Sequence, residues 1–142
     1  MSSFAGTRTK RAAFGTHGTM SYLESDFLDA ARTGNTAEVK SILSDDKGVV
    51  NPAIQDNYAI KMAAANGHKA IVKLLLDDGR VDPNAADLYA LRMAAYNGHG
   101  EIVDMLVDRA RGLRYLGDVV EDIVEAGVNE DVMTVFKYRG FV

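Results

Sequence analysis

Histidine and aspartate are the residues of this sequence from which catalysis or metal binding would be built, because they exchange protons and bind metal ions near neutral pH. The chain has three histidines and no cysteine. His68 and His99 each follow a turn glycine at the same place in two similar segments, and His17 has no acidic neighbour. Equivalent atoms of adjacent packed helices lie about 8 to 10 Å apart, which is too far for two imidazoles to share one zinc ion. The pattern favours a structural role for His68 and His99 at the beginning of a helix.

Two aspartate pairs are the other candidates, since neighbouring carboxylates can act as general acid and base. Asp45-Asp46 and Asp77-Asp78 stand at the same place, after an apolar helical segment, and neither pair fits a calcium-binding loop. Gly112 and Gly117 match no glycine pattern that binds phosphate. We therefore predict that the chain is not an enzyme, holds no metal and requires no cofactor, and that both aspartate pairs solvate turns.

The elements that carry these residues belong to one globular unit of ordinary composition. The chain has 142 residues, of which 47% are hydrophobic and 25% are charged. These values exclude a wholly disordered, collagen-like or coiled-coil chain. Lys73 and Asp77-Asp78 interrupt the most apolar segment, so the sequence predicts no membrane span.

Residues 1–23 form a basic segment ahead of an acidic remainder. Arg8, Lys10 and Arg11 are its only charged residues, whereas residues 24–142 hold 13 basic and 20 acidic side chains. The segment is rich in Ser, Thr, Gly and Ala and has no sustained apolar period, so we predict an extended N-terminal arm outside the core. Three interpretations remain open: a flexible tail, an arm that docks on a partner, and a mitochondrial targeting peptide.

Residues 24–142 contain an internal repeat. Segments that begin at Ala30, Ala63 and Ala94 share the pattern Ala-Ala-x-x-Gly-x-x-x-x-Val, and their glycines lie 33 and 31 residues apart. A degraded fourth copy aligns on Gly127, another 29 residues along the chain. The predicted units span residues 24–56, 57–87, 88–117 and 118–142.

Each copy predicts two antiparallel helices. The alanine pair lies in the first helix, which ends where the glycine adopts a left-handed conformation. After the glycine, apolar residues such as Ile71, Leu74 and Leu75 recur with the period of a second helix. Linkers with an X-Pro step separate the copies. Because one helix pair does not bury its apolar face alone, we predict that the copies stack into a solenoid.

The segments NGHKAIVKLLL (66–76) and NGHGEIVDMLV (97–107) resemble the second half of the ankyrin repeat. The resemblance implies an all-α ankyrin-repeat solenoid of about four helix-turn-helix units. Where the family has T-P-L-H, this chain has Tyr58-Ala59-Ile60-Lys61 and Tyr89-Ala90-Leu91-Arg92, which are similar to the divergent repeats of large DNA viruses and amoebae. We expect Tyr58 and Tyr89 to pack in place of the threonine, and Lys61 and Arg92 to reach a neighbouring carbonyl or carboxylate.

The resemblance also implies a concave surface, formed by turn tips and first helices, that binds a protein partner. Carrying the family's surface positions over by the glycine register gives these candidates: Tyr22, Arg32 and Thr33 in the first copy; Ile54, Gln55, Asn57, Ala65 and Asn66 in the second; Leu88, Tyr96 and Asn97 in the third; Arg114, Tyr115 and Glu125 in the fourth. Tyr96 is the expected anchor, because tyrosine is a common interface anchor and the aligned residues, Ala65 and Arg32, show that the position is not core. Ile54 and Leu88 have an alternative role in contacts with the next repeat. Phe141 either folds back on the last repeat or inserts into a partner.

The sequence therefore favours a non-catalytic protein-interaction module that binds a protein partner through the concave surface and the N-terminal arm. We expect an intracellular location, in the cytoplasm or a virion, with the mitochondrion as the lesser alternative. Two alternatives stay open: a structural subunit of a large assembly such as a virion or organellar particle, and weak nucleic-acid binding through the arm. Three basic residues beside an acidic body disfavour nucleic acid.

Overall fold

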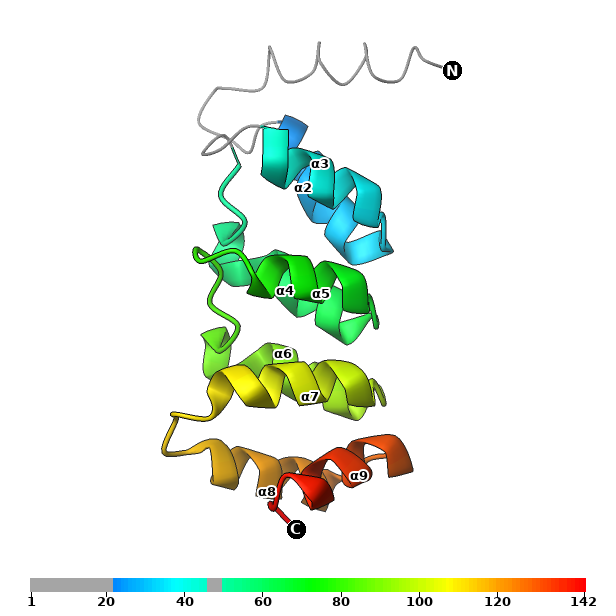
Figure 1. Ribbon diagram of the computed structural model, residues 1–142, viewed down its shortest axis with the longest axis vertical. Coiled ribbons are helices and arrows are strands. Elements are labelled where there is room, and N and C mark those ends of the chain that lie inside the picture. The colour runs from blue at the N-terminus through cyan, green and yellow to red at the C-terminus, as the bar shows by residue number, and fades with distance from the viewer. Residues whose placement is uncertain (1–21, 46–49) are drawn as a thin grey trace.

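The computed structural model describes residues 22–45 and 50–142, which form eight helices and no strand. The helices pair as helix-turn-helix units, and the four pairs stack in chain order along the molecule (Figure 1). Their bounds are α2 (Tyr22–Thr33), α3 (Thr36–Asp45), α4 (Ile54–Ala65), α5 (Lys69–Leu76), α6 (Ala85–Tyr96), α7 (Gly100–Ala110), α8 (Leu116–Ala126) and α9 (Glu130–Tyr138). The predicted all-α solenoid is confirmed. The predicted arm residues Arg8, Lys10 and Arg11 lie outside the described residues.

A glycine with left-handed φ forms the turn within each pair. The φ angle is +94° at Gly34, +81° at Gly67 and Gly98, and +98° at Gly127. The first two turns carry a second constraint, because a Cβ atom built on Gly34 or on Gly67 would lie 2.7 Å from the imidazole Cε1 of the next repeat's histidine. Glycine is required there both by the backbone conformation and by the close approach of the following repeat.

The core runs the length of the stack between the first and second helices. One valine from each second helix is completely buried, namely Val39, Val72, Val103 and Val132. The first helices contribute buried alanines such as Ala63 and Ala94. These small side chains let α4 pack directly against α6. One buried valine per repeat, with an alanine pair in each of the first three repeats and Ile123 and Val124 in the fourth, therefore builds a continuous apolar layer.

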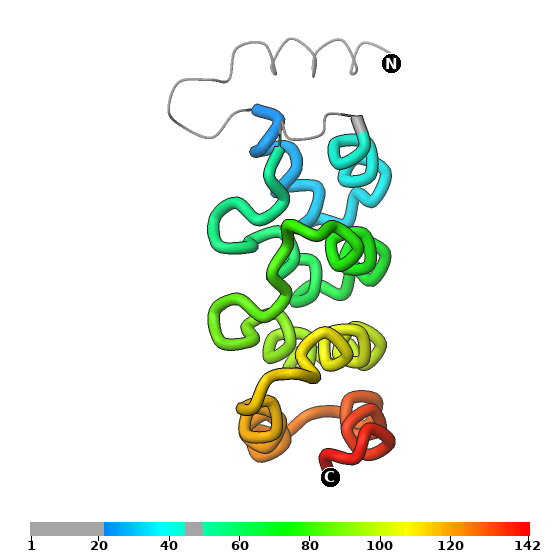
Figure 2. Tube along the Cα trace, turned by 60° about the vertical axis from the view of Figure 1, so that its left-hand side comes forward, coloured from blue at the N-terminus to red at the C-terminus, as the bar shows by residue number. Residues whose placement is uncertain are grey.

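Helices α4 and α6 each begin with a left-handed turn that the sequence did not predict. Residues 55–57 have φ angles of 54°, 56° and 62°, and residues 86–88 have φ angles of 56°, 57° and 62°. The right-handed part of each helix begins only after this turn, and the segments that enter α4 and α6 project on the same side of the stack (Figure 2). This conformation costs L-residues about 1 to 2 kcal/mol each, so other contacts must hold the turns.

In the fourth helix pair, other side chains take the roles that histidines have in the middle repeats. Asn129 stands in the place of the histidines: its Oδ1 accepts the Val132 N–H at 3.0 Å, and its Nδ2 donates to the Gly98 carbonyl at 3.3 Å. Phe141 folds back after α9 and places its ring edge-on to Phe136, with centroids 6.2 Å apart. The first of its two expected roles, packing on the last repeat, is the one observed.

Candidate functional site

The exposed sides of α2, α4, α6 and α8, together with the turns that flank these helices, form the surface that we call the first-helix face. Two residues before each turn glycine, this face carries a row of four unlike side chains: Arg32, Ala65, Tyr96 and Glu125. Four residues before each glycine, a buried row holds Ala30, Ala63, Ala94 and Ile123. The side chains of the buried row are all apolar. Those of the outer row differ in size and charge from one repeat to the next.

Most of the predicted contact residues do lie at the surface. Tyr22, Tyr96 and Tyr115 expose 48%, 41% and 40% of their area, which is high for aromatic side chains. The remaining exposed members of the predicted set are Arg32, Thr33, Gln55, Asn66, Asn97, Arg114 and Glu125. Ile54 and Ala65 are half-buried, and Ile54 packs against the core.

The prediction that Asn57 and Leu88 belong to the surface is wrong. They expose 7% and 1% of their area. Both are the last residue of a left-handed turn, which directs the side chain inward. Asn57 Oδ1 there accepts the Asp82 N–H at 2.8 Å, while Leu88 joins the hydrophobic core. Leu88 is therefore a core residue, and its expected contact with the next repeat stays a prediction.

A basic residue on the following helix braces each left-handed turn. Lys61 Nζ lies 3.1 Å from Asp56 Oδ2. Arg92 donates from Nε to the Asp87 carbonyl at 2.9 Å and from a terminal nitrogen to Asp87 Oδ2 at 3.2 Å. The expectation that these two bases reach a carbonyl or carboxylate is confirmed. The turns are therefore held as fixed shapes at the edge of the first-helix face.

The histidines connect neighbouring repeats. His68 Nε2 lies 2.9 Å from the Arg32 carbonyl, and His99 Nε2 lies 3.1 Å from the Ala65 carbonyl. Asn66 and Asn97 donate from Nδ2 to the same two carbonyls, at 3.1 and 2.8 Å. The structural role predicted for the histidines is confirmed. The inter-repeat bonds of the two asparagines were missed, although the recurrence of Asn-Gly-His in both middle copies was the available signal.

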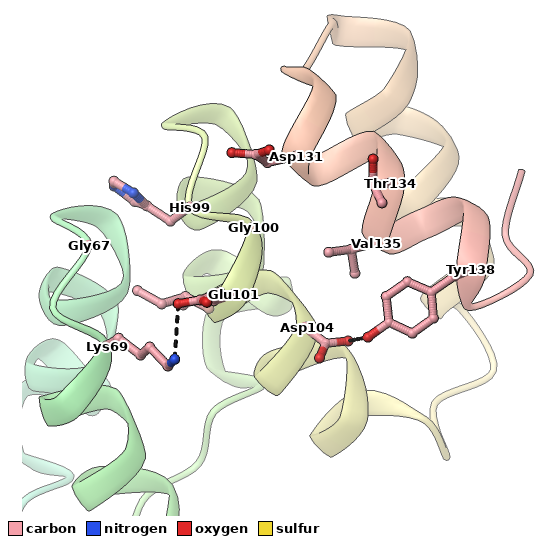
Figure 3. A pocket seen from close by; sticks show the side chains of 11 residues that line it. Gly67, Lys69, His99, Gly100, Glu101, Asp104, Asp131, Thr134, Val135 and Tyr138 are labelled. Carbon is pink, nitrogen blue, oxygen red and sulfur yellow. Dashed lines mark hydrogen bonds and ion pairs between the residues drawn. The ribbon is translucent and has the colours of Figure 1, made fainter.

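A groove of about 590 Å³ lies on the opposite side of the stack, along α5, α7 and α9 (Figure 3). Its polar groups are largely paired: Lys69 Nζ lies 2.9 Å from Glu101 Oε1, and the Tyr138 hydroxyl donates to Asp104 Oδ1 at 2.7 Å. Burial alone would raise the pKa of Asp104, but hydrogen bonds from Arg139 and Tyr138 outweigh it and hold that pKa below its ordinary value. Asp104 is thus an ionised acceptor that anchors the end of α9.

The described part of the chain offers no metal centre, because residues 22–45 and 50–142 hold no cluster of three or more potential metal-ligating side chains. Over the same residues, no helix is both long and apolar enough to cross a membrane. The hydrogen bonds and ion pairs of the first-helix face and of the groove instead stabilise turns and repeat contacts. The first-helix face and the groove are therefore surfaces of fixed shape.

The family comparison agrees with the helix pairing and the turn geometry. Residues 27–115 match the family model of ankyrin repeats, with three copies. The chain belongs to the ankyrin-repeat family. Ankyrin repeats are generally protein–protein interaction modules, and ankyrin-repeat proteins are typically non-catalytic. No curated protein sequence matches the chain significantly, so the likeness to viral and amoebal repeats stays a prediction.

The matched region ends at Tyr115, just before α8. The α8 and α9 pair nevertheless continues the ankyrin stack, with Val132 buried at the position of the repeat valine and Asn129 bonded to the preceding turn. Helix α8 has no further helix pair packed beyond it in the described structure (Figure 1). The last repeat has therefore kept the ankyrin geometry while losing most of the sequence pattern.

Proposed function

We propose that the chain is a non-catalytic module that binds a protein partner through the first-helix face, with Tyr96 as the main anchor. The observation that supports this most directly is the exposure of Tyr96, 41%, in a row where the other repeats carry Arg32, Ala65 and Glu125. A large aromatic side chain at a position with no packing requirement is typical of a binding anchor.

The backbone beneath Tyr96 is well fixed, which favours binding. Asn97 and His99, on the same turn, both bond to the Ala65 carbonyl of the preceding repeat. A partner that covers Tyr96 therefore does not have to order the turn, and the entropic cost of association is reduced. Arg114 and Tyr115, exposed just before α8, extend the same face.

Two alternative functions, a structural subunit and a nucleic-acid binder, predict different experimental results. A structural subunit of a large particle would use the same face, but it would be recovered from the purified particle in fixed stoichiometry. A nucleic-acid binder would depend on Arg8, Lys10 and Arg11, and its retention on nucleic acid would fall steeply with added salt.

The test is partner capture with two matched tyrosine variants. Tyr96→Ala removes the proposed anchor, whereas Tyr138→Ala removes a tyrosine with 66% exposure on α9, away from the first-helix face. We expect Tyr96→Ala to weaken retention of the same partner about 30-fold, which corresponds to a hot spot of about 2 kcal/mol. Tyr138→Ala should retain the partner, and circular dichroism should show both variants folded. Equal retention by both variants would refute the assignment of the face.

A further inference from the structure

The first-helix face changes character between the middle repeats and the last one. In the third copy, the first helix places Tyr89, Arg92, Met93 and Tyr96 on this face, of which Tyr96 is exposed and the other three are half-buried. In the fourth copy, the equivalent positions are Asp118, Glu121, Asp122 and Glu125. All four acids are exposed and share one side of α8, opposite the buried residues of that helix. The face therefore joins an aromatic centre on α6 to an anionic edge on α8.

The basic residues of α4 and α6 form ion pairs, whereas the acids of α8 do not. Lys61 and Arg92 are paired with Asp56 and Asp87 of their own turns. Among the described residues, by contrast, the four carboxylates of α8 have no cationic partner. Such a face fits a segment that presents an aromatic ring next to several positive charges and brings no acid of its own.

The chain itself contains such a segment. Residues 1–23 have no acid, and Arg8, Lys10 and Arg11 are followed by Phe14. We propose that this segment docks in cis on the first-helix face, with the three basic side chains opposite the acids of α8 and Phe14 beside Tyr96. The inference rests on the proposed function, since it assigns an occupant to the surface proposed there for the partner.

The length of chain between these residues and α2 suits binding within one molecule. Three helix spacings of about 8 to 10 Å separate the first pair from α8, or about 24 to 30 Å. The 11 residues from Arg11 to Tyr22 span up to about 36 to 40 Å when extended. The extended segment is therefore longer than the distance from the first pair to α8, so the basic side chains reach α8. Phe14, three residues closer to Tyr22, reaches α6.

Docking in cis would make the arm a competitor of the partner. A short flexible connection gives an effective concentration of about 1 mM. If the free segment bound with a Kd of about 100 µM, the arm would cover the face about 90% of the time, and a competing ligand would bind about elevenfold more weakly than to the chain without the arm.

The absence of cysteine allows one label to report the contact. A nitroxide attached to Thr9→Cys should broaden the amide NMR signals of α8 and of the end of α6, and leave those of α3 and α5 sharp. Tenfold dilution should not change the broadening, because the contact is intramolecular. Salt at about 1 M, where the screening length falls to about 3 Å, should remove it.

Two variants of equal charge change provide the matched control. Asp122→Asn with Glu125→Gln neutralises half of the anionic edge and should largely abolish the broadening. Glu130→Gln with Asp131→Asn makes the same change at the start of α9 and should preserve it. Equal effects of the two variants would overturn the proposed contact.

Two further outcomes would also overturn it. One is that the α8 signals stay sharp in the labelled chain. The other is that nitroxide-labelled chain also broadens the α8 signals of isotope-labelled, nitroxide-free chain in a mixture, which would assign the contact to a second copy. If the docking fails while Tyr96→Ala still loses its partner, the proposed function stands; if Tyr96→Ala retains the partner, the function fails independently.

Discussion

The contact between a turn glycine and the next repeat's histidine makes a stability prediction with a built-in control. Gly67 and Gly140 both end a helix with left-handed φ, +81° and +86°, and in both turns the next N–H donates to the carbonyl five residues earlier. A Cβ built on Gly67 lies 2.7 Å from His99 Cε1 and 3.0 Å from its Nδ1, whereas a Cβ on Gly140 has no heavy atom within 4 Å. Alanine at Gly140 therefore carries only the backbone strain, while alanine at Gly67 also displaces the histidine.

The two costs follow from the contacts. Left-handed φ costs alanine about 1 to 2 kcal/mol, which is the whole expected effect of Gly140→Ala. Gly67→Ala adds the loss of the hydrogen bond between His99 and the Ala65 carbonyl, worth about 0.5 to 1.5 kcal/mol. We expect a total of about 2 to 3 kcal/mol, because the Asn97 amide still satisfies that carbonyl.

Urea unfolding followed by circular dichroism measures the difference. With a slope of about 2 kcal/mol/M, the midpoint should fall by about 0.5 to 1 M for Gly140→Ala and by about 1 to 1.5 M for Gly67→Ala. Adding His99→Ala to Gly67→Ala should cost less than the sum of the two single changes, since the hydrogen bond from His99 is lost only once and the new methyl group no longer meets the imidazole. Equal midpoints for the two glycine variants, or strict additivity in the cycle, would show that the histidine packing imposes no constraint.

Two other substitutions test the corrected site and the end of the stack. Asn57→Ala should destabilise the chain by about 1 to 3 kcal/mol in urea unfolding, because the Asp82 N–H loses its buried acceptor; a change below about 0.5 kcal/mol would mean that this bond is dispensable. Arg139→Ala should cost about 1 to 2 kcal/mol at pH 7, since Arg139 Nε donates to Asp104 at 2.6 Å. The pKa of Asp104 is lowered in the fold, so this contribution is present above the ordinary value of 3.8 and is lost as the pH falls through the folded pKa. Unfolding of both chains near pH 3 should therefore show a smaller difference than at pH 7, and an unchanged difference would contradict the pairing.

For the aspartate pair Asp77-Asp78, the sequence predicted the position in a turn but not the contacts. Asp77 and Asp78 were expected to solvate a turn, and Asp77 does lie exposed after α5. Asp78 does more: it holds Arg80 through paired bonds at 3.0 and 2.9 Å, and the hydrogen bond from Arg80 lowers the pKa of Asp78. Arg80 in turn donates to the Val50 carbonyl at 3.3 Å. The sequence predicted the turn, but it did not predict this link to a linker 30 residues earlier.

The repeat, the helix pairs, the order of stacking and the buried rows can all be predicted from the amino-acid sequence. These features depend on local signals: a glycine that ends a helix, a 3.6-residue apolar period and alanines at fixed spacing from the glycine. The pairing of Lys61 and Arg92 with nearby acids belongs to the same group, because each partner lies only five residues away.

Which residues of the left-handed turns are exposed depends on contacts between repeats, so the sequence did not predict it. Asn57 and Leu88 stand among exposed neighbours, yet three successive left-handed residues turn both side chains inward. That conformation is unfavourable for an isolated chain and persists because distant groups hold it, such as the Asp82 N–H 25 residues from Asn57. The histidine bonds likewise join atoms 36 and 34 residues apart. Local sequence signals do not encode such contacts, since they exist only after the repeats have stacked.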